Sequence, residues 1–132
     1  MHLTIFGAGY VGLSTAVCFA KRYQVSLVDI DYNKVMAIKN NEPVIYETGL
    51  DALLEEGLRS GRLKIYHILD RIPQADIIFI TVGTPSDHDG YINLQYVRDI
   101  VKTIKQLKSE LLNPKYSLIV IRSTVIPGTT SK

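Results

Sequence analysis

The residues best suited to chemistry form a glycine-rich loop near the start of the chain. Gly7-Ala8-Gly9-Tyr10-Val11-Gly12 matches the pattern G-x-G-x-x-G, with a short apolar segment before it and a helix-like segment after it. In that setting Gly7 permits a tight turn, Gly9 lets a pyrophosphate approach the backbone, and Gly12 lets helix and strand pack closely. The N–H groups at the positive end of the helix dipole would then hold the phosphates.

An acidic residue follows this loop at the distance expected of a dinucleotide site. Asp29 ends the next apolar segment, about 20 residues after Gly7. A carboxylate there accepts hydrogen bonds from the adenosine ribose and repels the 2′-phosphate of NADP, so the pattern favours NAD. Asp29 could instead cap the next helix, but Asp31 is placed for that role. An S-adenosylmethionine site, which also pairs such a loop with an acid, is left open as an alternative.

Strand-like and helix-like periodicities alternate along the chain, which is typical of an α/β fold. We expect strands over residues 3–6, 25–28, 63–66, 77–82 and 118–121, and helices over residues 11–21, 31–40, 48–61 and 93–111. Because helices separate the strands, the strands should pair in parallel through right-handed crossovers. The prediction is a Rossmann-like, three-layer αβα fold with a doubly wound parallel sheet in the order 3-2-1-4-5, truncated before its last strand.

Composition argues against several other classes of protein. The 132 residues carry a net charge of +2 and no dense Lys/Arg cluster, which argues against nucleic-acid binding. The single cysteine, Cys18, excludes an internal disulfide and a cysteine-rich metal site. No apolar run approaches a membrane span and no signal-peptide pattern precedes the first strand, so we expect a cytoplasmic protein without a metal. One domain over residues 1–132 accounts for the length.

Four further segments resemble the UDP-glucose/GDP-mannose dehydrogenase family, so that the resemblance covers the whole chain. The first loop continues the likeness to Ser14, and Asp29 with Lys34 is similar to the family's ribose-binding stretch. Residues 43–50, which begin at Pro43, resemble its P-x-x-Y-E-P-G-L segment, and residues 82–85 and 122–130 resemble the ends of its fourth and fifth strands. The resemblance identifies the chain as the N-terminal NAD-binding part of a longer nucleotide-sugar 6-dehydrogenase.

This resemblance implies an activity and a set of site residues. The family oxidises the C6 primary alcohol of a nucleotide sugar, such as UDP-glucose, to a carboxylate with two NAD+ per turnover. Its nucleophilic cysteine and sugar-binding residues belong to a later region, and we expect the parent enzyme to be a homo-oligomer. Thr124 matches a threonine that helps position a catalytic water or proton. The residues that the resemblance assigns to NAD are Gly7, Gly9, Tyr10, Val11, Gly12, Asp29, Lys34, Val82, Gly83, Thr84, Ser123 and Thr124.

Two positions depart from the family's pattern. Thr48 replaces a proline, and we expect it to begin the next helix as an N-cap. Arg122 replaces a lysine; its planar guanidinium keeps the charge but places its donors differently, which leaves its role open. Cys18 lies mid-helix among apolar residues, and we interpret it as a core thiol rather than as a nucleophile.

Other polar residues have a simpler interpretation. We expect Glu47 to favour the N-terminus of the helix that follows it, with a substrate-facing role left open. His88 lies between Asp87 and Asp89, where turn chemistry explains the sequence better than a metal site. Two other functions stay open: a non-catalytic NAD-sensing or interaction module, and another NAD-dependent hydroxy-group dehydrogenase.

Overall fold

The computed structural model describes residues 1–42 and 44–131, so Pro43 of the segment at 43–50 lies outside the described residues. The strands are β1 (His2–Phe6), β2 (Gln24–Asp29), β3 (Leu63–His67), β4 (Ile77–Ile80) and β5 (Leu118–Ile121). The helices are α1 (Tyr10–Phe19), α2 (Tyr32–Lys39), α3 (Leu50–Ser60), α4 (Gln95–Gln106), α5 (Lys108–Leu111) and the 3₁₀ turn η1 (Thr129–Ser131). The strand order is β3-β2-β1-β4-β5 and every adjacent pair is parallel. The predicted fold class and strand order are confirmed.

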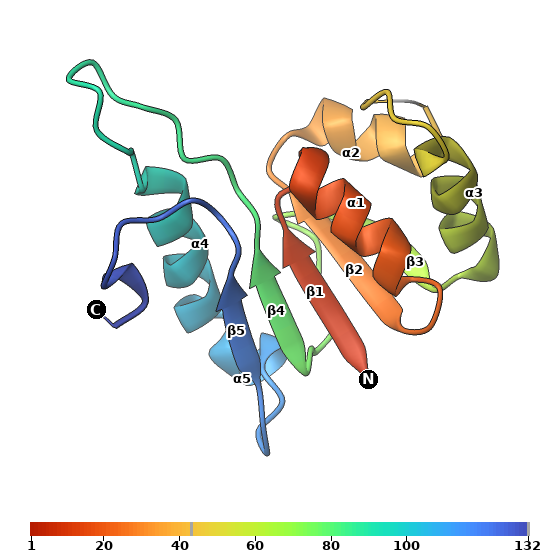
Figure 1. Cartoon of the computed structure of the whole chain (residues 1–132). Helices are drawn as coiled ribbons and strands as arrows, with labels where there is room; N and C mark the ends of the chain where they lie inside the picture. Colours follow the sequence, from red (N-terminus) through yellow and green to blue (C-terminus); the bar gives the residue numbers. More distant parts are fainter. Residues whose placement is uncertain (43, 132) are drawn as a thin grey trace.

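The two faces of the sheet bury different cores. Leu3 and Ile5 of β1 pack with residues of α1, α2 and α3, whereas Phe6 packs on the opposite face with Val97 and Ile104 of α4. Figure 1 shows α1, α2 and α3 over the half of the sheet that contains β1, β2 and β3, and α4 beside β4 and β5. Strands that are covered on both faces read as continuous apolar runs, as this sequence does.

Local signals place several element boundaries correctly. The side chain of Asp31 accepts a hydrogen bond of 3.1 Å from the backbone N–H of Lys34 and caps α2. Gly61 ends α3 in the left-handed conformation, with φ of 76°. His2 is the first residue of β1 and His67 is the last residue of β3.

Three expectations about local structure were wrong. The N-cap of α3 is Gly49, with φ of 84°, rather than Thr48, because a left-handed turn at the glycine starts the helix one residue later. The helix expected over residues 93–111 divides at Leu107 into α4 and α5. β4 ends two residues before the expected residue 82.

The expectation that Cys18 is a buried core thiol was also wrong. The face of α1 that packs on the sheet carries Gly12, Leu13, Ala16 and Val17, and Cys18 falls outside this stripe and is exposed. The near-uniform apolar character of α1 hid which face is buried, since periodicity orients a helix only where polar residues interrupt it. No helix in the described part of the chain is long and apolar enough to cross a bilayer.

Candidate cofactor site

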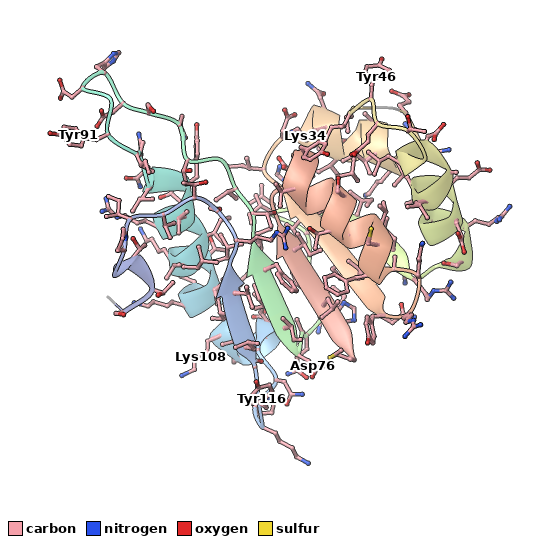
Figure 2. All side chains as sticks on the ribbon, viewed as in Figure 1. Lys34, Tyr46, Asp76, Tyr91, Lys108 and Tyr116 are labelled. Carbon is pink, nitrogen blue, oxygen red and sulfur yellow. The ribbon has the colours of Figure 1, made fainter. Side chains whose placement is uncertain are left out.

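A cavity of about 420 Å³ opens where the carboxyl ends of β1, β2 and β4 meet. In open α/β folds this edge of the sheet is where ligands bind. Six of the residues predicted to bind the cofactor line the cavity: Gly7, Gly9, Asp29, Lys34, Val82 and Gly83. The arrowheads of the strands in Figure 1 point toward this edge, and Figure 2 shows Lys34 at the same end of the molecule.

The glycine loop joins β1 to α1, and two of its glycines leave too little space for a side chain. Gly7 has φ of 104°, and a Cβ atom there would lie 2.9 Å from the backbone nitrogen of Val82. A Cβ on Gly12 would overlap the carbonyl oxygen of Gly7. Gly9 differs, because nothing lies within 4 Å of a Cβ built there. Gly9 is also the N-cap of α1 and supplies no side-chain cap, so the helix N-terminus is open to an anion.

The carboxylate of Asp29 ties the loop to the start of α2. Its Oδ2 accepts a hydrogen bond of 2.7 Å from the backbone N–H of Ala8, and its Oδ1 accepts one of 2.8 Å from Asp31. The Nζ of Lys34 lies 3.8 Å from Oδ2. A carboxylate oxygen can accept more than one hydrogen bond, so both oxygens of Asp29 keep capacity for a ribose diol.

The far wall of the cavity comes from α4, which the sequence analysis did not include in the site. Tyr96, Asp99, Ile100 and Thr103 line it, with spacings of three and four residues that put them on one helix face. Arg98, Lys102 and Lys105 of the same helix are charged and exposed, so from the sequence Asp99 is expected on a solvated face. The spacing was visible in the sequence, but nothing in it indicated that β2 and β3 end opposite this face.

Thr81 is a second residue that the sequence analysis missed. Its hydroxyl lies 3.0 Å from the carbonyl oxygen of Phe6 and 2.9 Å from that of Gly7, so it joins the end of β4 to the glycine loop. Thr81 also lines the cavity. It directly precedes the predicted segment that begins at Val82, and this adjacency was the signal available in the sequence.

The remaining predicted residues do not line the cavity: Tyr10, Val11, Gly12, Thr84, Ser123 and Thr124. The hydroxyl of Ser123 donates to the carbonyl oxygen of Val82 at 2.7 Å, which joins the ends of β4 and β5. Thr124 follows it and is exposed. The predicted segments after β4 and β5 are therefore neighbours in space.

Tyr10 connects the glycine loop to the segment before α3. Its hydroxyl donates to Oε1 of Glu47 at 2.9 Å, and this bond together with the negative charge of Glu47 raises the pKa of Tyr10. The carbonyl oxygen of Glu47 accepts from the backbone N–H of Leu50 at the first turn of α3. The carboxylate of Glu47 thus contacts Tyr10, whereas the sequence analysis expected it to favour the N-terminus of α3.

The loop around His88 is a turn stabilised by Asp87. The Oδ1 atom of Asp87 accepts hydrogen bonds from the backbone N–H groups of Asp89 and Tyr91, at 3.0 and 2.9 Å. This pattern is the side-chain turn that the sequence favoured over a metal site. Among residues 1–42 and 44–131, no three His, Cys, Asp or Glu side chains gather where they could hold a metal ion.

Comparison with known proteins assigns this site to a family. All of residues 1–132 match the model of the UDP-glucose/GDP-mannose dehydrogenase family, NAD binding domain. The chain belongs to this family. It is 37% identical to the GDP-mannose 6-dehydrogenase of Pseudomonas putida over 131 residues and 37% identical to the UDP-glucose 6-dehydrogenase of Bacillus subtilis over 132 residues, and each match covers 98% of this chain.

Solved structures agree with this assignment. A ternary complex of GDP-mannose dehydrogenase from Pseudomonas aeruginosa superposes with a TM-score of 0.87 at 34% identity, over 100% of this chain and 30% of that one. The UDP-D-ManNAc dehydrogenase of Pyrococcus horikoshii gives a TM-score of 0.89 at 30% identity, over 99% and 30% of the two chains. The chain spans about 30% of the length of these relatives.

The residues of the cavity fit the NAD that this family binds. The open space at Gly9 admits a pyrophosphate against the N-terminus of α1, and Asp29 offers two acceptors beside it. The tight contact at Gly12 keeps that helix end against β1. The predicted cofactor and the predicted family are confirmed.

Proposed function

We propose that this NAD-binding domain serves an enzyme that oxidises the C6 primary alcohol of a nucleotide sugar to a carboxylate. The observation that carries the proposal is the cavity beside Gly9 and Asp29, in a chain whose relatives are named nucleotide-sugar 6-dehydrogenases. Those two relatives are named for GDP-mannose and UDP-glucose, and we propose a nucleotide sugar of this kind as the substrate here.

The residues of this chain would bind and orient the cofactor. The backbone N–H groups from Gly9 to Gly12 would hold the pyrophosphate, and Asp29 with Lys34 would bind the adenosine ribose. Residues 82–84 would line the cofactor, and Ser123 and Thr124 would lie near the nicotinamide, which supplies the hydride acceptor of the oxidation. The hydrogen bond from Ser123 to Val82 supports this proposal, because it holds the two strand-end segments together.

Thr124 would help position a water or proton at the reacting sugar. Its exposed side chain follows Ser123 at the carboxyl edge of the sheet. We propose that the nucleophilic cysteine and the sugar-binding residues lie outside residues 1–132, since relatives are more than three times as long. Cys18 lies on α1 and does not line the cavity, so it is a poor candidate for the nucleophile. On the basis of the same family relationship, we also propose that the whole enzyme is a homo-oligomer and that it is cytoplasmic.

A calorimetric titration of this chain tests the cofactor part of the proposal. NAD+ and S-adenosylmethionine are titrated separately into the wild-type chain and into a Lys34→Gln variant. We expect NAD+ to bind, the variant to bind it more weakly, and S-adenosylmethionine to give no heat. Tighter binding of S-adenosylmethionine would contradict the proposal.

The oxidation itself is tested on the whole enzyme that contains these residues. UDP-glucose and GDP-mannose are supplied with NAD+, and we expect a uronate product with two NADH formed per sugar. Thr124→Ala should lower kcat by a larger factor than it raises the KM for NAD+, whereas a variant of the exposed Thr130, Thr130→Ala, should match the wild type. An enzyme that binds NAD+ but oxidises no nucleotide sugar would instead favour the sensing module.

A further inference from the structure

The cavity continues past the ribose-binding acid toward α4. Asp29 and Lys34 line it on the side of β2 and α2, and Ile100 lines it on the side of α4. Ile30 and Ile68 also contribute apolar side chains to its wall. A dinucleotide with its phosphates at the glycine loop and its ribose at Asp29 would put its base between these isoleucines, since a flat aromatic ring gains most from apolar contacts on its faces.

Two polar residues of α4 in this part of the cavity wall, Asp99 and Thr103, offer hydrogen-bond acceptors. The hydroxyl of Thr103 donates to the backbone carbonyl of Asp99 at 3.0 Å, which uses its only proton. Oδ1 of Asp99 accepts from Nε2 of Gln95 at 2.7 Å, which orients the carboxylate. An ionised carboxylate has no proton to donate, so Oδ2 of Asp99 and the lone pairs of Thr103 can only accept.

This arrangement distinguishes purine bases by the group at position 6. Adenine carries an exocyclic amine there, which donates hydrogen bonds, whereas a 6-oxo purine carries a carbonyl oxygen that accepts them. We infer that Asp99, supported by Thr103, selects adenine as the base of the dinucleotide by accepting a hydrogen bond from its exocyclic amine. This inference rests on the proposed NAD function and adds a specificity-determining residue on α4 to it.

Nicotinamide hypoxanthine dinucleotide provides the test, because it differs from NAD+ only in its 6-oxo base. Calorimetric titration of the wild-type chain should give a dissociation constant for NAD+ about ten-fold lower than for the hypoxanthine analogue, as expected when the carboxylate of Asp99 faces the carbonyl oxygen of the 6-oxo base. In the Asp99→Asn variant the side-chain amide can either donate or accept, so the ratio of the two dissociation constants should fall toward one.

A matched variant separates the hydrogen bond from the loss of charge. Glu56→Gln removes one negative charge from the exposed face of α3, away from the cavity, and should keep the wild-type ratio. Equal binding of the two dinucleotides by the wild type, or an unchanged ratio in Asp99→Asn, would overturn the inference while leaving NAD binding intact. Failure of NAD+ itself to bind would overturn the proposed function and this inference together.

Discussion

Gly12 lies so close to Gly7 that any side chain at Gly12 would overlap the carbonyl oxygen of Gly7. A Cβ atom at Gly12 would also lie 2.6 Å from the hydroxyl oxygen of Thr81, and this hydroxyl itself contacts the carbonyl oxygen of Gly7. At Gly9, by contrast, a Cβ atom meets nothing within 4 Å. Two glycines of one motif therefore have different roles. Gly12 lets α1 pack against β1, and Gly9 leaves space for a ligand.

Alanine at these two positions should separate stability from binding. Gly12→Ala should lower the free energy of unfolding by about 2–4 kcal/mol, because the backbone must move to admit the methyl group. Gly9→Ala should change stability little, since its φ of −78° suits alanine, but should weaken NAD+ binding because the methyl group enters the phosphate space. Urea denaturation and calorimetry measure the two effects. A large loss of stability in Gly9→Ala, or unchanged stability in Gly12→Ala, would contradict these roles.

The contact between Tyr10 and Glu47 predicts a shifted titration. The hydrogen bond to Glu47 and its negative charge raise the pKa of Tyr10 above its ordinary value of 10.0. In Glu47→Gln the charge is absent and ionisation of the phenol is no longer opposed, so the pKa of Tyr10 should fall back toward 10.0. NMR of ring-labelled tyrosine through an alkaline titration measures this, with Glu55→Gln as the control. A Tyr10 pKa that is the same in Glu47→Gln and the wild type would show that the contact does not persist in solution.

Two titratable groups near the amino ends of the strands, Asp76 and His2, should make the fold less stable in acid. Asp76 accepts hydrogen bonds of 2.8 Å from the backbone N–H of His2 and from the amide of Asn113, and these bonds lower the pKa of Asp76. Figure 2 shows Asp76 at the end of the molecule opposite Lys34. Burial likewise lowers the pKa of His2, despite the opposing charge of Asp76.

The lowered pKa values of Asp76 and His2 change the free energy of unfolding in the same direction as the pH falls. A lowered pKa in the folded state gives stability that is present above the ordinary value and is lost as the pH falls through the folded value. The contribution of His2 should therefore decline below pH 6.5 and that of Asp76 below pH 3.8. Denaturant unfolding across this range should show a shallower acid dependence in Asp76→Asn than in the wild type. Parallel curves for the two proteins would rule out the role of Asp76.

Most of the fold was predictable because its signals are local. Asp31 and Gly61 mark helix ends through their own backbone preferences, and the apolar runs at β1, β2 and β4 show which segments are buried on both faces. Alternation of strands with helices then restricts the sheet to parallel pairing. Thr48 failed as a cap because the adjacent Gly49 adopts a left-handed turn that threonine cannot share at low cost.

The site was only partly predictable. The glycine loop and Asp29 are recognised by spacing along one stretch of chain, whereas the wall on α4 is made of residues about 70 positions away from Asp29. The sequence showed which face of α4 is polar but not that the ends of β2 and β3 stand opposite Asp99 and Thr103. Contacts of this kind depend on how helices and strands pack together, which periodicity alone does not specify.

The most direct test of the central claim compares NAD+ with NADP+ at Asp29. Asp29→Asn retains one side-chain oxygen for the backbone N–H of Ala8 and removes the charge that opposes a 2′-phosphate. Calorimetry should show that the wild type binds NAD+ at least about ten-fold more tightly than NADP+, and that the variant loses most of this preference. Equal affinities in the wild type, or an unchanged preference in Asp29→Asn, would contradict the assignment of Asp29 as the residue that selects NAD.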